Sequence, residues 1–273
     1  MTTLAIPFYV ALSCFAQESA DEIMNKVAAN MARGSELRKF YVYTQKLHTR
    51  LLRTDKKVSR EERREYLVTP KGDETEKELV HFEGQYVKKN QVVTYSTPTD
   101  DADGPGEGID LAMLSFITNH FVENKDSKDG VALGLFPFLP KDIPNYKFTL
   151  LKKEDFRGRP IHRIAFAGKS KETPWAGETL IDAEDFHPVS VQNKLTFKMP
   201  LAARVMLGTN LRQTGFSLTF TRVAPGIWFP ATYGTELRVD LLFAYKRVLT
   251  MNMESSDFKK VAADSSITFE TPR

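Results

Sequence analysis

The sequence predicts a mainly β (α+β) protein, in which a large curved antiparallel sheet forms a half-open barrel with a few covering helices. From Leu37 onward, long stretches alternate apolar and polar residues with the period of half-buried strands. Several of them end in turn chemistry, such as FRGRP from Phe156 to Pro160 and APG from Ala224 to Gly226. Long antiparallel strands bury one face, so the sheet needs a cover of other segments.

The first expected element is a short amphipathic helix. Ser19 to Glu22 supply capping and acidic first-turn residues, and Ile23, Val27 and Met31 follow at a spacing of four. Gly34 is expected to end this helix. A long hairpin follows, because both 38–53 and 60–70 alternate, with a charged connection between them.

The middle of the chain differs from the rest. Thr97 to Gly108 is a polar loop rich in Gly and Pro, and Ile109 to Val122 is apolar around most of a helical circumference. Such a helix has to be buried or bound to an apolar partner. The remaining strand candidates are Glu78 to Lys89, Tyr146 to Lys153, Ile161 to Ala167, Glu178 to Asp182, Pro188 to Met199, Leu211 to Val223 and Thr232 to Val248.

Three segments are candidates for the cover of the sheet: the helix after Ser19, Ile109 to Val122, and Gly130 to Pro140. They either fill the concavity as a core or form a lid over a ligand cavity. Residue parity along each strand gives the expected lining. We predict a hydrophobic cavity lined by Phe216, Leu218, Phe220, Leu237, Val239, Leu241, Leu195 and Phe197, with Leu114, Ile117 and Phe121 on the lid side.

Length and charge limit the classes of function. The chain has 273 residues, of which 41% are hydrophobic, and no internal repeat or long linker divides it. With 38 basic and 35 acidic residues, the formal charge is only +3, so no nucleic-acid partner is expected.

The N-terminus predicts export. Leu4 to Ala16 is an apolar run with no charged residue, of a length that fits a signal peptide better than a membrane span. We therefore expect a signal peptide at 1–16, a single domain at 17–273, and a periplasmic or secreted protein. The alternative is a buried first strand. Cys14, the lone cysteine, lies in this segment, where lipoprotein anchoring is a weak alternative; without it the mature chain has no thiol.

ETLIDAEDFHPVSV, from Glu178 to Val191, concentrates acidic residues and a histidine between two apolar runs. Asp182 to His187 contain suitable metal ligands, but a metal site needs ligands that converge from more than one element. We therefore predict a solvent-exposed structural turn, with no metal and no cofactor. The other histidines lie in separate segments, and no nucleophile and base pair stands out, so no catalytic residue is predicted.

Two further segments have alternative interpretations. Lys46 to Glu65 contains eight basic and four acidic residues, which form either a solvated strand face or a contact with anionic lipid headgroups or an acidic partner. Pro200 to Leu211 is an apolar connection that either covers the sheet or contacts lipid.

Two phrases of the sequence carry a resemblance to a known superfamily. ADEIMNKVAANMARGSELRKFYVYTQ after an export signal, and ETLIDAEDFHPVSVQ later in the chain, resemble the periplasmic LolA/LolB/RseB-like proteins of lipoprotein sorting and lipid sensing. The resemblance implies a non-catalytic carrier for a lipid or lipoprotein acyl chain, with contact to a membrane surface or a membrane protein. It leaves open a sensor or assembly module of the same fold that binds a protein partner; a hydrolytic enzyme is the third alternative.

Overall fold

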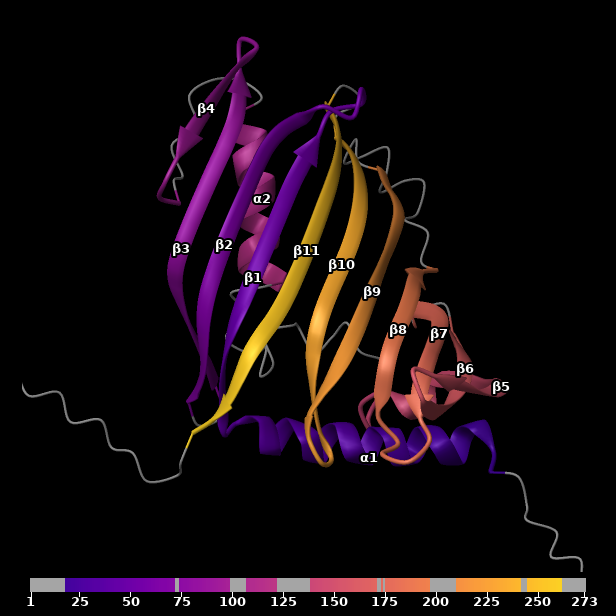
Figure 1. Ribbon diagram of the computed structural model, residues 1–273. Helices are drawn as coiled ribbons and strands as arrows, with labels where there is room; N and C mark the ends of the chain where they lie inside the picture. Colours follow the sequence, from indigo (N-terminus) through magenta and orange to yellow (C-terminus); the bar gives the residue numbers. More distant parts are fainter. Residues whose placement is uncertain are drawn as a thin grey trace, which may run out of the picture.

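The described strands form one continuous antiparallel sheet with eleven members, in the order β4-β3-β2-β1-β11-β10-β9-β8-β7-β6-β5 (Figure 1). The structure is a computed structural model, and it describes residues 18–71, 74–98, 107–121, 138–170, 173, 175–196, 210–241 and 245–261. The sheet is curved and does not close, since β4 and β5 are its edges. The fold class predicted from the sequence is confirmed.

The strands fall into two meanders joined by one pairing. β1 to β4 are consecutive neighbours, as are β5 to β11, and β1 pairs with β11 to unite the two groups. The strands are β1 (Tyr41–Leu52), β2 (Val58–Lys71), β3 (Glu74–Lys88), β4 (Gln91–Tyr95), β5 (Tyr146–Phe156), β6 (Arg159–Gly168), β7 (Trp175–Asp182), β8 (Pro188–Leu195), β9 (Asn210–Ala224), β10 (Ile227–Leu241) and β11 (Tyr245–Lys260).

Two of the hairpin turns are made by pairs of residues with positive φ. Arg157 and Gly158 have φ of 56° and 77° between β5 and β6, the two left-handed residues that a tight hairpin of type I′ requires. Lys89 and Asn90, at 48° and 64°, make the same kind of turn between β3 and β4. The first turn was expected from its glycine, whereas β4 was not among the predicted strands.

One predicted strand is wrong. The segment from Thr232 to Val248 is not a single strand but the end of β10 and the start of β11, and Leu241 pairs with Tyr245 across the connection. The alternation of Leu237, Val239 and Leu241 continues in phase into Tyr245, so the pattern alone did not reveal the reversal. β11 then continues to Lys260, well beyond the predicted end.

Helix α1 (Ala20–Arg38) crosses the lower ends of the strands, from β5 and β8 toward β11 (Figure 1). Ser19 caps it, with a reciprocal capping box to Glu22. The expected end at Gly34 is wrong, because the helix continues for another turn. Gly34 is buried there, and a Cβ in its place would lie 3.1 Å from Nη1 of Arg38, a group that donates a hydrogen bond to the Trp228 carbonyl. The glycine gives room to that arginine.

Helix α2 (Glu107–Phe121) packs against β1 and β2 on one face of the sheet, which we call the inner face; the opposite face is the outer face. The predicted lid segment is thus helical and lies on the sheet. Of the third predicted cover, Phe138 is fully buried and its ring meets Phe166 edge-on, while residues 130–137 lie outside the described residues. None of the described helices is long and apolar enough to span a membrane.

Candidate functional site

The apolar part of the inner face consists of lateral rows that run across neighbouring strands. In one row, Val191 of β8 pairs with Leu218 of β9, which pairs with Tyr233 of β10. Tyr233 pairs in turn with Met253 of β11, and the row ends at Leu47 of β1. Directly paired residues of antiparallel strands project from the same face, so these side chains form one apolar surface.

The structure describes the side chains of six residues that the sequence predicted to line a cavity, and that they line one stays a prediction. Phe216, Leu218 and Phe220 are buried on β9, Val239 is buried and Leu237 half-buried on β10, and Leu114 of α2 is fully buried in the same core as β9. The remaining candidates cannot be placed to the same degree. Leu195, Leu241, Ile117 and Phe121 lie in β8, β10 and α2 with side chains outside the described part, and Phe197 lies outside the described residues altogether.

Sequence reasoning missed the contribution of β11 to this surface. Leu249, Met251 and Met253 of β11 are buried in the centre of the inner face. Their alternation, in TMNME, is a regular strand signal, but the predicted strand ended at Val248. Met side chains adapt to irregular apolar surroundings.

Asp110, in the first turns of α2, attaches this helix to the sheet. Its carboxylate accepts hydrogen bonds from Ser59 of β2 and from Tyr245 and Arg247 of β11, with 3.0 Å to Arg247 Nε. Asp110 is almost completely buried. Burial first, and then the bond to Asp110, raise the pKa of the Tyr245 hydroxyl, so it stays a proton donor. One buried carboxylate therefore connects the helix to two strands.

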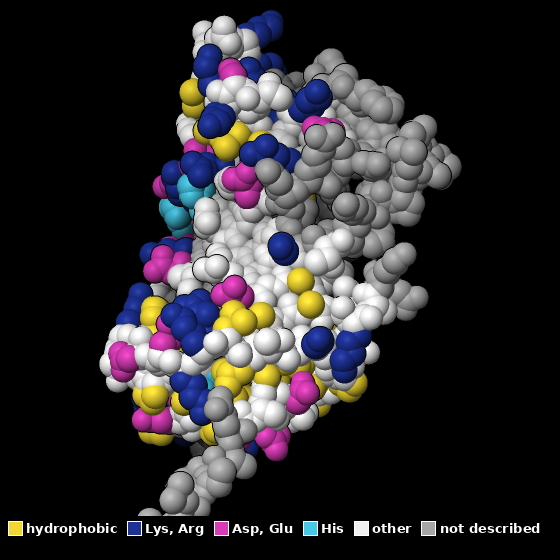
Figure 2. Space-filling model, turned by 90° about the vertical axis from the view of Figure 1, so that its right-hand side faces the viewer, with side chains coloured by type: hydrophobic (Ala, Val, Ile, Leu, Met, Phe, Trp, Pro, Cys, Tyr) yellow, Lys and Arg dark blue, Asp and Glu magenta, His cyan; other side chains and the backbone are white. Residues whose placement is uncertain are grey.

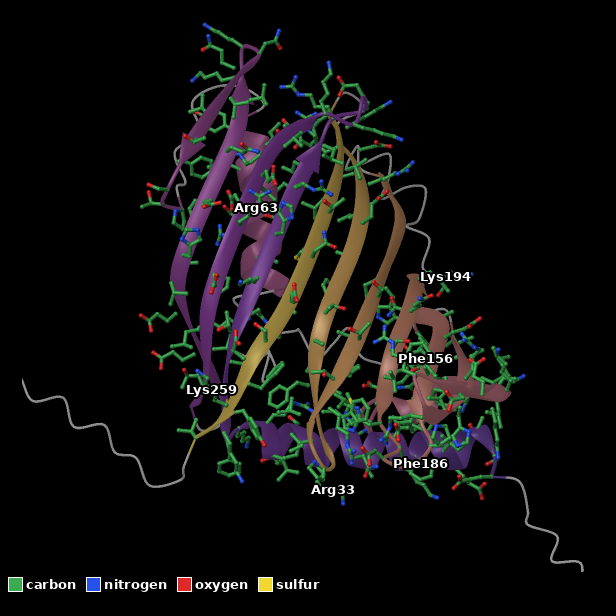
Figure 3. The ribbon with its side chains drawn as sticks, in the orientation of Figure 1. Arg33, Arg63, Phe156, Phe186, Lys194 and Lys259 are labelled. Atoms are coloured by element: carbon green, nitrogen blue, oxygen red, sulfur yellow. The ribbon has the colours of Figure 1, made fainter. Side chains whose placement is uncertain are left out.

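The basic run from Lys46 to Glu65 divides between the two faces. Lys46, His48 and Arg63 project from the outer face, whereas Arg60 and Arg64 are buried on the inner face. Arg63 is visible on the outer side of β2 in Figure 3. The sequence had predicted either a solvated strand face or a contact with an anionic partner, and neither prediction included buried arginines.

The outer face carries a shallow groove of about 580 Å³ that crosses β3, β2, β1, β11 and β10. Its cationic and histidine side chains have acidic neighbours: Lys46 lies 3.8 Å from Glu65, His48 and Arg63 each lie 2.6 Å from Glu61, and His81 lies 3.2 Å from Glu83. In Figure 2, basic, acidic and histidine side chains gather along the left-hand edge of the molecule. Exposed pairs of this type contribute little to stability, and their charges largely balance, which favours a solvated strand face.

The acidic turn between β7 and β8 is structural, as predicted, but of its residues from Asp182 to His187 only Glu184 is solvent-exposed. Asp182 is fully buried, where it accepts hydrogen bonds from Arg159 and from the backbone amides of Glu184 (3.0 Å) and Asp185 (2.8 Å). Burial alone would raise the pKa of Asp182, but these donors hold it below its usual value. The carboxylate therefore fixes the backbone of the turn.

The same turn joins α1 to the sheet. Asp185 accepts hydrogen bonds from Trp228 Nε1 and Arg222 Nε, both at 2.9 Å, and its carbonyl accepts one from Asn30 of α1. Phe186 lies beside α1 in Figure 3, with Lys26 Nζ 4.4 Å from its ring centre. In the described part of the chain no group of three or more His, Cys, Asp or Glu side chains could hold a metal ion.

Comparison with known proteins gives similarities of fold. No protein-family model matches the chain, and no curated protein matches it. A solved domain from Vibrio parahaemolyticus, named for outer membrane lipoprotein sorting, has a TM-score of 0.36 and 11% identity, covering 89% of this chain and 95% of that one. A DUF1329 family protein from Desulfovibrio piger has a TM-score of 0.37 and 11% identity, covering 93% and 98%. A LolA superfamily protein from Nitrosomonas europaea has a TM-score of 0.32 and 9% identity, covering 93% and 99%. The last of these proteins is named for the superfamily that the two sequence phrases resemble.

Proposed function

We propose that the protein binds an acyl chain, free or attached to a protein, between α2 and the apolar rows of the inner face, without chemical catalysis. The observation that carries this proposal is the continuity of the apolar surface across β8, β9, β10, β11 and β1. Helix α2 packs at the β1 and β2 side of this surface and is attached there through Asp110. Each methylene that leaves water contributes about 0.8 kcal/mol, so one long chain can supply most of the affinity.

The direct test is mass spectrometry of organic extracts from gently purified protein. We expect an acyl lipid in an amount comparable to that of the protein, and displacement of a fluorescent fatty-acyl probe by fatty acids. A protein that contains no lipid and does not bind the probe would contradict the proposal. The outer groove would then favour the alternative, a sensor or assembly module that binds a protein partner.

A charge on the inner face is expected to abolish acyl-chain binding. In Met251→Glu the carboxylate stands between the buried Leu249 and Met253 on the inner side of β11, where an acyl chain cannot hydrate it. Asn252→Glu is the matched control, because the next residue of the same strand projects from the outer face and is exposed. Probe binding should be lost in the first variant and kept in the second. Equal binding by both, in folded protein, would contradict the placement of the chain.

Weakening the contacts of Asp110 that attach α2 to the sheet is expected to speed ligand exchange. Asp110→Asn keeps the shape of the side chain but removes the charge that Arg247 and Tyr245 contact. A hydrogen bond to a charged group contributes about 1.5 to 3 kcal/mol, so the off-rate of a bound fluorescent fatty acid should rise about ten-fold or more. Asp55→Asn, in the exposed β1–β2 turn, serves as the control in stopped-flow measurements. An unchanged off-rate would mean that α2 does not cover the ligand.

A further inference from the structure

Three exposed apolar side chains meet where α1 ends, β1 begins and β11 ends. Leu37, Phe40 and Val261 are 37%, 47% and 40% exposed. The Phe40 amide donates to the Leu37 carbonyl at 3.4 Å, and the Phe40 carbonyl accepts a hydrogen bond from the Val261 amide at 2.7 Å. These two bonds hold the three residues next to one another, and we call them the apolar tip.

Two members of the apolar tip project from the same face of the sheet. The bond between Phe40 and Val261 continues the register in which Tyr41 pairs with Lys260, so the two residues are directly opposite each other. Tyr41 is buried on the inner face, and successive residues of a strand alternate between faces. Phe40 and Val261 therefore form one exposed apolar surface on the outer side of the sheet.

The grouping of these side chains is more informative than their exposure. In the described part of the chain nine large apolar side chains are exposed, and three of them belong to the apolar tip. Single exposed apolar residues are normal on soluble proteins, whereas grouped ones mark contact sites. The backbone beneath the tip is well fixed, because Arg38 donates to the Trp228 carbonyl at 2.9 Å and the ring of Tyr41 meets that of Phe229 edge-on.

Basic side chains flank the apolar tip. Lys259 pairs with Val42 and so projects from the same outer face as Phe40, while Lys260 projects from the other side of the strand. Both lysines are exposed, and no ion pair joins either of them to another residue that the structure describes. Figure 3 shows Lys259 at the lower end of β11, close to the end of α1.

The end of α1 adds to this positive charge. Arg33 is exposed in the last two turns of the helix, and Lys39 follows the helix, 2.6 Å from Glu36. Among the described, solvent-accessible residues within four positions of the apolar tip along the chain, four are basic and two, Glu36 and Asp257, are acidic. The surroundings of the tip thus have a surplus of two positive charges.

This combination fits an anionic lipid surface better than a second copy of the chain. A two-fold contact joins the same patch of both copies, so it would bring the two positive surpluses together. A stable protein interface also covers about 800 Å² on each partner, with about 20 residues or more, and the apolar tip has three. A membrane surface accepts apolar side chains among its acyl chains and basic ones among its headgroups, without a matching shape.

We propose that the apolar tip, with the basic residues around it, docks the protein on the surface of an anionic lipid membrane. Leu37, Phe40 and Val261 enter the boundary between headgroups and acyl chains, and Lys259 and Lys260 contact lipid phosphates. The protein lies on the membrane through this contact and does not span it. The contact goes beyond the proposed function, because it uses neither α2 nor the apolar rows of the inner face.

Co-sedimentation of the full chain with lipid vesicles tests this docking surface. Vesicles of phosphatidylglycerol and phosphatidylcholine in equal parts are compared with vesicles of phosphatidylcholine alone. Each basic residue near an anionic surface contributes about five-fold, so we expect the anionic vesicles to bind at least about ten-fold more tightly at low salt. Raising the salt to about 0.5 M should remove most of this difference, because it screens the exposed charges.

Variants identify the residues. Phe40→Ser is expected to weaken binding to the anionic vesicles about five- to ten-fold, and Lys259→Gln together with Lys260→Gln about twenty-fold. The matched controls are Val92→Ser and Lys246→Gln, which change exposed residues near the starts of β4 and β11, at the opposite end of the sheet (Figure 1). Both controls should bind within about two-fold of the unmodified protein.

The outcomes separate this docking surface from the proposed function. Met251→Glu, which should not bind the fatty-acyl probe, should still sediment with vesicles, and Phe40→Ser should still bind the probe. Absence of vesicle binding, equal binding to both kinds of vesicle, or an equal loss in the control variants would overturn the docking surface and leave the proposed function in place. Self-association that Phe40→Ser abolishes would also overturn it, in favour of a second copy.

Discussion

Replacing Asp182 with alanine is expected to lower the free energy of unfolding by about 3 to 5 kcal/mol, a large part of the stability of a domain. The substitution removes the acceptor of two backbone amides and the partner of Arg159. A buried amide left without a partner is unfavourable by about 1 to 3 kcal/mol. Arg159 is 30% exposed and can regain water, so the amides account for most of the loss.

Glu184→Ala is the matched control for this prediction. Glu184 also contacts Arg159, at 2.9 Å, but its side chain is 62% exposed, and exposed pairs are worth about 1 kcal/mol or less. Urea denaturation of both variants, followed by tryptophan fluorescence, measures the difference. Similar losses in the two variants, or a loss below about 1 kcal/mol in Asp182→Ala, would show that the turn does not depend on its buried carboxylate.

The position of this turn explains why such a loss would affect the whole protein. It contacts α1 through Asn30, the start of β6 through Arg159, and the β9–β10 hairpin through Arg222 and Trp228. Sequence reasoning recognised the turn but expected it to face solvent, because a short acidic segment usually does. The partners that bury it come from three distant parts of the chain, and no local pattern encodes them.

Much of the sheet could be predicted because its local signals agree. Alternation, glycine turns and the capping of α1 all act over a few residues, and they located most strands to within a few positions. The break between β10 and β11 was missed for a related reason: the apolar parity of Leu241 continues in Tyr245, so alternation shows no interruption.

The candidate site was predictable only in its apolar part. In REERRE, from Arg60 to Glu65, both parities consist of charged residues, so no difference in hydrophobicity indicates which side chains point inward. The anchor of α2 was equally hidden, because the partners of Asp110 lie between 51 and 137 residues away along the chain. Polar residues that come together from several strands can be recognised only when the register of those strands is known, and only the structure gives that register.

Acidification from pH 6.5 to pH 5 is expected to reduce the free energy of unfolding by about 2 kcal/mol through His187 alone. The ring is 2% exposed, stacks on Trp228 with an angle of 7° between planes, and meets Phe220 edge-on. Its Nδ1 donates to the Pro188 carbonyl at 3.1 Å, and Nε2 has no partner among the described groups. A proton on Nε2 would be a buried charge, and this burial lowers the pKa of His187 to about 3.

The direction of the pH effect follows from proton uptake. Below the ordinary histidine pKa of 6.5, the unfolded chain binds a proton at His187 and the folded chain does not. The free energy of unfolding therefore falls by about 1.4 kcal/mol for each pH unit, until the folded ring also titrates. His162, whose pKa burial also lowers, adds a loss of the same sign in this window. Carboxylates such as Asp182, with pKa values below their usual range, lose their contribution only at lower pH.

Comparison with His187→Phe isolates the contribution of this one residue. Phenylalanine can occupy the apolar site between Trp228 and Phe220 and does not titrate, whereas His162 and the carboxylates are unchanged. Urea denaturation at pH values between 5 and 7 should give curves of stability against pH that converge as the pH falls. The slope of the unmodified protein should exceed that of the variant by about 1.4 kcal/mol per pH unit well below pH 6.5. Parallel curves would mean that the ring accepts a proton in the folded protein, and that α1 and the turn separate enough to hydrate it.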